Sequence, residues 1–145
     1  MLRGNHPATV DAKGRLKIPA AFLGELRAFG EKFYVTSERG DCAMIYPLHV
    51  WDEIEAKLKN VSRHSRAKKK YLDVTNYYGQ LVELDGQGRL LLPAILRDAA
   101  ELMGEVAVLG NQDQLTVWNN TRFQARLNTN PLTQEDEKEL FDLGI

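Results

Sequence analysis

The sequence predicts an α+β fold, mostly β, in which two copies of one unit intertwine as an intramolecular pseudo-dimer. The first reason is a repeated motif. VDAKGRLKIPAAFL at residues 10–23 returns as LDGQGRLLLPAILR at residues 84–97, with six of fourteen positions identical. The second reason is that an extended strand–turn–strand segment follows each copy, at 32–47 and 105–119. Because half of this chain would bury little apolar surface alone, the copies are expected to share one core.

Each copy begins with two short strands joined by a D-x-x-G-R turn. Apolar residues alternate with polar ones on both sides of the turn, which is typical of a half-buried hairpin. Asp11 and Asp85 can each cap the turn through the side chain, because Asp favours such turns. Gly14 and Gly88 can each take a positive φ. The strands of the second hairpin are expected at 79–85 and 88–92.

Short helices are expected after the strand pairs. Pro19 ends the first pair and suits the first turn of a helix. Phe22, Leu26 and Phe29 then fall on one helical face. The helix is expected to stop at Gly30. Further helices are expected at 49–61, near 63–76, at 94–103 and at 120–127.

Four segments are expected along the chain. They are a first repeat (5–52), a helical and partly basic connector (53–78), a second repeat (79–124) and an acidic C-terminal tail (125–145). The tail contains a helix-start pattern at Thr133, so it is expected to be either a short helix or a frayed end.

The charges are divided unevenly between the two halves of the chain. Residues 1–72 carry 14 Lys/Arg and 8 Asp/Glu, whereas residues 73–145 carry 5 Lys/Arg and 12 Asp/Glu. The net charge of −1 hides this division. It points either to a polyanionic partner for the first half or to attraction between the halves.

Composition and motifs argue against several classes of protein. No run is long enough for a transmembrane helix, and the first residues lack the apolar stretch of a secretion signal, so a reducing cytoplasm fits best. Cys42 is the only cysteine, which excludes an internal disulfide and predicts an inert, buried thiol. The three histidines are scattered, and no P-loop, H-E-x-x-H or G-x-S-x-G motif is present. We therefore expect no enzyme activity, cofactor or metal.

The stretches RGNHPATVDAKGRLKIPAAF and ELDGQGRLLLPAILR resemble the two signature copies of the MraZ family, and the likeness extends along the whole chain. The resemblance implies a duplicated swapped-hairpin barrel with short helices, similar to SpoVT–AbrB domains. It implies a bacterial repressor that binds short promoter repeats in double-stranded DNA upstream of the division and cell wall gene cluster, including its own gene. It also implies a ring-like homo-oligomer associated with the nucleoid, with no membrane partner.

Lys13, Arg15 and Lys17 are the first candidates for DNA contact. Alternate positions across a hairpin can place all three on one face, where they could meet phosphates or guanine edges. The alternative is a solvated hairpin rim. The resemblance favours DNA, because it implies that the binding surface lies at the D-x-x-G-R motif. Arg3, just before the first strand, is a second-rank candidate, and His6 is expected to be only a surface or capping residue.

The Asp–Arg spacing of the motif has a second interpretation, which is structural. Arg15 with Asp11, and Arg89 with Asp85, are each expected to form an ion pair that braces the turn. Around Arg89 the two lysines of the first copy are replaced by Gln87 and Leu91. Arg89 is therefore expected to be the structural partner of a DNA-reading first copy.

Three further features leave alternatives open. The basic run at 63–71 could follow DNA phosphates, form a solvated helix face or pair with the acidic half. The acidic tail is expected to be solvated or to contact a neighbouring subunit. An oligomeric scaffold or antitoxin-like protein binder is the alternative function. The aromatic residues are expected in the core, not stacked on bases; they are Trp51, Tyr77, Tyr78, Trp118 and Phe123.

Overall fold

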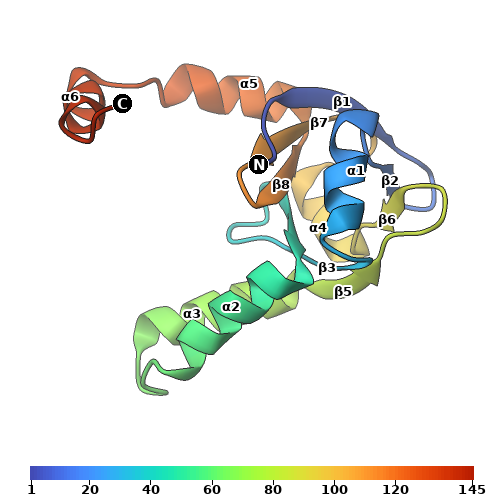
Figure 1. The fold of residues 1–145 in the computed structure, drawn as a ribbon, viewed down its shortest axis with the longest axis horizontal. Helices are drawn as coiled ribbons and strands as arrows, with labels where there is room; N and C mark the ends of the chain where they lie inside the picture. Colours follow the sequence, from blue (N-terminus) through green and yellow to red (C-terminus); the bar gives the residue numbers. More distant parts are fainter.

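The computed structural model describes residues 1–145 and shows one eight-stranded antiparallel sheet, curled into a nearly closed barrel, with six helices (Figure 1). The α+β, mostly β prediction is confirmed. The strands are β1 (Asn5–Val10), β2 (Arg15–Lys17), β3 (Lys32–Thr36), β4 (Ala43–Pro47), β5 (Gln80–Glu83), β6 (Arg89–Leu91), β7 (Gly104–Asn111) and β8 (Gln114–Trp118). The helices are α1 (Ala20–Ala28), α2 (Leu48–Lys59), α3 (Arg66–Tyr77), α4 (Ala94–Ala100), α5 (Asn120–Thr129) and α6 (Gln134–Asp142).

Adjacent pairs of strands from the two halves alternate around the barrel, so the halves do not form two separate sheets. The order is β5-β3-β4-β8-β7-β1-β2-β6. Thus β1 pairs with β7, β2 with β6, β3 with β5, and β4 with β8. This exchange covers strand edges that a lone half would leave open. The predicted intertwined pseudo-dimer is confirmed.

The predicted local hairpins are only partly correct. The turns lie where the motif places them, but β1 and β2 share a single residue pair, Val10 with Leu16. Beyond that pair β1 follows β7 for six residues, while β2 follows β6 for three. The strands of each hairpin diverge because pairing with the other half satisfies more backbone groups than pairing with each other would.

The core lies inside the barrel and is built by both halves. Leu16 of β2 and Leu90 of β6 face each other there and are fully buried. Phe22 and Leu26 bury one face of α1, as predicted, and the helix ends before Gly30, which takes a φ of +116°. Helix α4 is shorter than predicted, because Glu101 adopts a left-handed conformation with a φ of 55°.

Helices α2 and α3 form an arm that projects from the barrel (Figure 1). Trp51 fixes the base of the arm, because its ring stacks on Tyr34 at 4.5 Å and lies 6.4 Å from Tyr71. The Thr75 carbonyl of α3 accepts hydrogen bonds from Tyr34 Oη at 3.0 Å and Thr36 Oγ1 at 2.7 Å. The arm is therefore anchored at its base, while its tip stands in solvent.

The aromatic prediction is correct except at one residue. Trp51 and Trp118 are buried, and Tyr78 and Phe123 are half-buried. Tyr77 is 64% exposed, because α3 turns its Thr75 face to the barrel and carries Tyr77 on the other side. Cys42 is buried as predicted, and desolvation raises the pKa of its thiol to about 12.

Candidate nucleic-acid interface

The first turn is closed by the Asp11 side chain. Asp11 Oδ1 accepts hydrogen bonds from the backbone N–H groups of Lys13 at 3.0 Å and Arg15 at 2.9 Å. The Gly14 N–H donates to the Asp11 carbonyl at 2.9 Å, and Gly14 takes a φ of +85°. An aspartate that bonds the backbone two residues ahead stabilises a tight turn, so the motif letters D and G define its shape.

Arg15 takes part in the same turn through its side chain. Its Nε donates to Asp11 Oδ2 at 2.8 Å, and both side chains are about one-third exposed. The backbone N–H of Arg15, together with its guanidinium, holds the pKa of Asp11 below its usual 3.8. Nη1 and Nη2 of Arg15 make no hydrogen bond within the chain. One edge of the guanidinium therefore braces the turn while the other is available to a ligand.

The second turn repeats this geometry. Asp85 Oδ1 accepts from the backbone N–H groups of Gln87 at 2.8 Å and Arg89 at 2.9 Å. Arg89 Nε donates to Asp85 Oδ2 at 3.0 Å, and Gly88 takes a φ of +74°. The Arg89 backbone N–H is the main cause that lowers the pKa of Asp85. The Asp–Arg ion pair is thus present in both copies.

The pairing of β2 with β6 brings cations from both copies onto one outward face. Lys17 lies opposite Arg89, and Arg15 lies opposite Leu91, while the residues between them point inward. We call this outward surface the β2–β6 face; it consists of Arg15, Lys17, Arg89 and Leu91. Two like charges placed directly opposite each other destabilise a sheet, so this arrangement suits an anionic ligand.

Lys17 belongs to the second turn and not to the first. Its Nζ donates to the Gln87 carbonyl, whereas only Lys13 and Arg15 accompany the first turn from their own copy. Arg15 and Lys17 point outward on the same side of β2, while the Lys17 side chain reaches across to the second turn. The cause is the strand exchange, which sets β2 beside β6.

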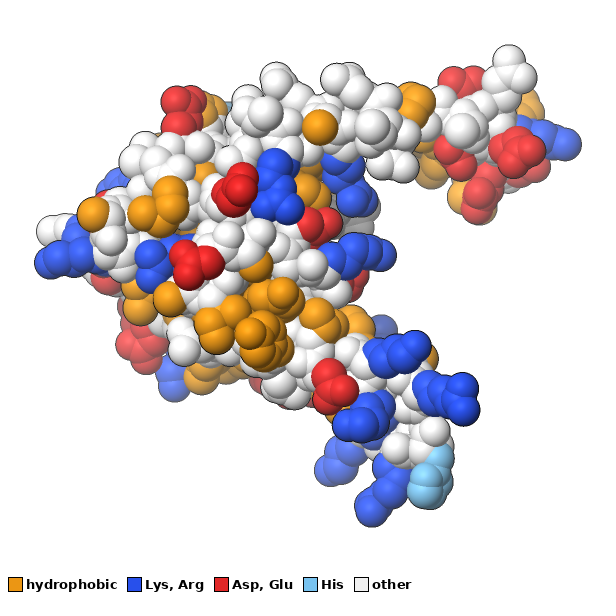
Figure 2. Space-filling model, turned by 180° about the vertical axis from the view of Figure 1, so that it is seen from behind, with side chains coloured by type: hydrophobic (Ala, Val, Ile, Leu, Met, Phe, Trp, Pro, Cys, Tyr) orange, Lys and Arg blue, Asp and Glu red, His pale blue; other side chains and the backbone are white.

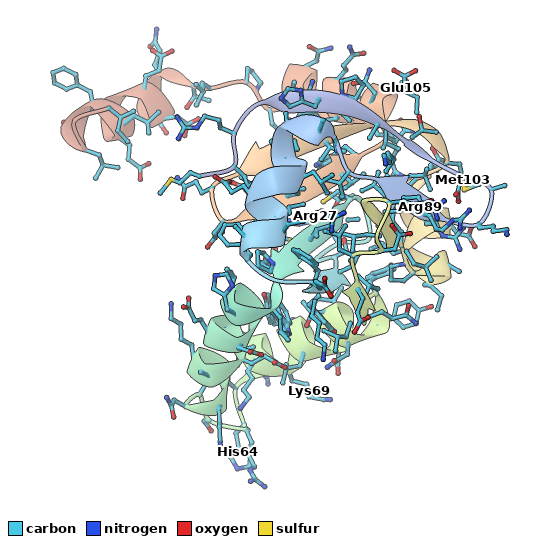
Figure 3. All side chains as sticks on the ribbon, turned by 45° about the vertical axis from the view of Figure 1, so that its right-hand side comes forward. Arg27, His64, Lys69, Arg89, Met103 and Glu105 are labelled. Atoms are coloured by element: carbon cyan, nitrogen blue, oxygen red, sulfur yellow. The ribbon has the colours of Figure 1, made fainter.

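The same exchange gives Arg89 basic neighbours that its own copy lacks. Lys17 lies opposite it, and Arg27 Nη2 of α1 donates to the Asp85 carbonyl at 3.4 Å. Figure 3 shows Arg27 on α1 and Arg89 on β6, both on the barrel. The neighbours of Arg89 in the sequence, Gln87 and Leu91, are uncharged, but its neighbours in space include two cations.

The remaining basic candidates lie elsewhere. Arg3 is exposed at the far end of β1, and at about 3.3 Å per residue the strand separates it from the first turn by roughly 25 Å. His6 packs edge-on against Phe22, with ring centroids 5.0 Å apart, so it is a packing residue. His64 and Lys69 mark the tip of the α2–α3 arm, away from Arg89 (Figure 3).

The arm and the tail carry opposite charges. Figure 2 shows Lys and Arg side chains gathered over the end of the arm, and Asp and Glu side chains on α6. The arm's run is partly engaged within the chain, because Lys69 lies 3.5 Å from Asp73 and Lys68 Nζ donates to the Val61 carbonyl at 2.9 Å. The basic run and the turns are therefore two separate positive regions.

No cluster of three or more His, Cys, Asp or Glu side chains is arranged to hold a metal ion, and none of the six helices has the length and apolar character needed to cross a bilayer.

Comparison with known proteins gives the family. The chain matches the family described as "MraZ protein, putative antitoxin-like" over residues 1–74 and 79–142. The transcriptional regulators MraZ of Acidobacterium capsulatum and Koribacter versatilis are 49% and 48% identical to it, over the full length of both chains in each case. The MraZ regulator of Halothermothrix orenii is 32% identical, also over both full lengths. The chain belongs to the MraZ family. It is a transcriptional regulator and not an enzyme.

Two arginines near the turns of this MraZ protein escaped the sequence reasoning. Arg27 reaches the second turn from α1, and Arg97 of α4 lies against Gly14 of the first turn. Each comes from the other half of the chain, so no local pattern marks them. Predicting them requires knowing that the strands exchange, because this exchange places the helix after each Pro-Ala against the turn of the opposite half.

Proposed function

We propose that this regulator binds double-stranded DNA through the β2–β6 face and the two turns beside it. The observation that supports this most is the register of β2 and β6, which sets Lys17 opposite Arg89 with Arg15 on the same side. None of these three cations has a carboxylate partner that occupies its whole charged group. Lys13, exposed on the first turn, extends the positive surface.

The chemistry of these side chains suits DNA. Arginine has a planar fork that can bind phosphate or guanine edges with two hydrogen bonds, and lysine supplies a mobile point charge for phosphate. The major groove of B-DNA admits a two-stranded β-ribbon. The β2–β6 pair, with a turn at each side, is such a ribbon. We include Arg89 in this surface, and we place Arg3 outside it.

The targets we propose are short promoter repeats upstream of the division and cell wall genes, including the regulator's own gene. One face with few cations binds weakly, because phosphate contacts supply most of the affinity. Several faces on one homo-oligomer would bind successive repeats with a high effective concentration. Occupied repeats would exclude polymerase, which makes the protein a repressor, and would place it on the nucleoid.

The C-terminal tail, which contains α6, is the feature that supports self-association. Helix α6 stands away from the barrel (Figure 1) and begins with a capping box between Thr133 and Asp136. A free helix of this length is marginal in water. Phe141, Leu143 and Ile145 are 68–82% exposed at its end. We propose that α6 packs on another copy of the chain, where the basic end of the α2–α3 arm offers the complementary charge.

The test of DNA binding compares Lys17→Ala with wild type by fluorescence anisotropy across a salt series. The probes are a duplex from upstream of the protein's own gene and a mixed-sequence duplex of equal length. Loss of one phosphate contact should weaken binding by about tenfold and flatten the slope of log K against log salt by about 0.9. Arg39→Ala, in the loop between β3 and β4, removes the same charge away from the face and should change neither. Wild-type behaviour of Lys17→Ala would contradict the proposal.

The alternative function is a protein-binding scaffold or antitoxin-like module. The exposed apolar end of α6 is the observation that favours it. This alternative predicts that the wild-type protein binds neither duplex at physiological salt.

A further inference from the structure

Arg97, on α4 of the second half, lies directly on the turn of the first half. A Cβ atom built on Gly14 would come within 2.2 Å of Arg97 Cζ, so the guanidinium covers the side of the turn that glycine leaves bare. Arg97 Nε donates to the Leu92 carbonyl at 3.0 Å, and the Leu92 N–H donates to the Gly14 carbonyl at 2.9 Å. Leu92, which directly follows β6, is therefore hydrogen-bonded both to the Arg97 guanidinium and to the first turn.

This guanidinium has no counter-charge within the chain. No carboxylate forms an ion pair with Arg97, and its Nη1 and Nη2 make no hydrogen bond. The residue is only partly exposed, so its guanidinium is partly desolvated, and its single hydrogen bond goes to a neutral carbonyl. The hydrogen bonds that Asp11 accepts come from Lys13 and Arg15, and none comes from Arg97.

The first turn therefore carries two guanidinium groups beside one carboxylate. Arg15 pairs with Asp11, Arg97 lies on Gly14, and Lys13 adds an exposed side chain on the same turn. Positive groups that lie close together repel each other. Arginine stays charged in proteins, so a bound anion would lower this repulsion. A phosphate offers several acceptor oxygens to the free Nη groups of Arg15 and Arg97.

The second turn shows that packing alone does not require arginine here. Leu23 of α1 precedes Arg97 by one repeat length (97 − 23 = 74, as 85 − 11 = 74). Its Cδ2 would lie 3.1 Å from a Cβ built on Gly88, so it covers the second turn in the same way. Since leucine fills the equivalent place, the arginine adds charge at the first turn beyond what packing needs.

We propose that Arg97 is a DNA-phosphate contact of the first turn, supplied by the opposite half of the chain. This inference rests on the DNA binding proposed above. It makes the turns unequal: the first binds phosphate with Lys13, Arg15 and Arg97 and is the tighter of the two. The binding site is then a product of the strand exchange, because neither half contains all three cations.

The test measures salt-dependent binding of Arg97→Leu and Arg97→Lys to the two duplexes, with urea unfolding of each variant. Arg97→Leu should weaken binding about tenfold and flatten the salt slope by about 0.9. Arg97→Lys keeps the charge and should retain the slope. Arg39→Leu removes an exposed arginine from the loop between β3 and β4, across the barrel from the turns (Figure 1), and should leave both unchanged. If Arg97→Leu does not fold, Arg97→Gln gives the same slope test.

Two results would overturn the inference. In the first, Arg97→Leu keeps wild-type affinity and slope while Lys17→Ala loses both, which leaves DNA binding intact and removes Arg97 from it. In the second, Arg97→Leu and Arg97→Lys both weaken binding with no change of slope. This result would mean that Arg97 only maintains the conformation of the turn and does not contact phosphate. Failure of the proposed function looks different, because the wild-type protein itself then binds neither duplex.

Discussion

The aspartates of the two turns each combine a structural and an electrostatic role. Asp11 and Asp85 accept backbone N–H groups with one oxygen and an arginine Nε with the other. They fix each turn and at the same time orient one edge of the arginine toward solvent. Removal of either arginine is expected to affect both the conformation of the turn and ligand binding. The salt dependence of binding and the stability to urea must therefore be measured separately.

These aspartates predict an acid-sensitive fold. The pKa values of Asp11 and Asp85 lie below their usual 3.8, so the carboxylates stabilise the fold above that pH. That stabilisation is lost as the pH falls through the lowered folded-state pKa. The double variant Asp11→Asn, Asp85→Asn should therefore lose part of the decline in the free energy of unfolding below about pH 4.

Urea denaturation across acidic pH checks this expectation. Asp52→Asn, at an exposed position on α2 with no hydrogen-bond partner, is the matched control. A double turn variant that keeps the full pH dependence of the wild type would show that the ionised turn carboxylates do not stabilise the fold.

At the scale of elements, the tail is the clearest case of a helix without a partner in its own chain. Deletion of residues 131–145 should leave the barrel folded, because α6 contributes no buried residue. It should reduce the homo-oligomer proposed above to a smaller species, since Phe141 and its apolar neighbours are removed. Light scattering after size exclusion measures the mass, and Phe141→Asp is a point variant with the same expected result. An unchanged mass in both would refute the role of α6 in self-association.

Local patterns predicted the elements well and their partners poorly. The start after Pro19, the stop at Gly30 and the D-x-x-G-R turns all depend on backbone preferences of single residues, so they could be inferred. The register of Lys17 with Arg89 depends on which half pairs with which, and no local signal carries that information. The exposure of Tyr77 has a similar cause, because the fold decides which face of α3 meets the barrel.

At the scale of the whole molecule, the intertwined architecture explains the uneven charge of the chain. Basic residues of the first half and Arg89 and Arg97 of the second meet around the turns. The other basic region lies on the arm and the acidic residues gather on α6, both away from the turns (Figures 1 and 2). The charge division seen in the sequence thus becomes three separate surfaces, of which the β2–β6 face is the proposed DNA contact.

Photo-cross-linking to DNA tests that assignment most directly. A photo-reactive amino acid is placed at position 17 on the β2–β6 face, and in a second protein at position 69 on the arm. With the duplex from upstream of the protein's own gene, we predict a covalent protein–DNA product from position 17 and little from position 69. Cross-links from position 69 alone would contradict the account and move the DNA-binding surface to the arm.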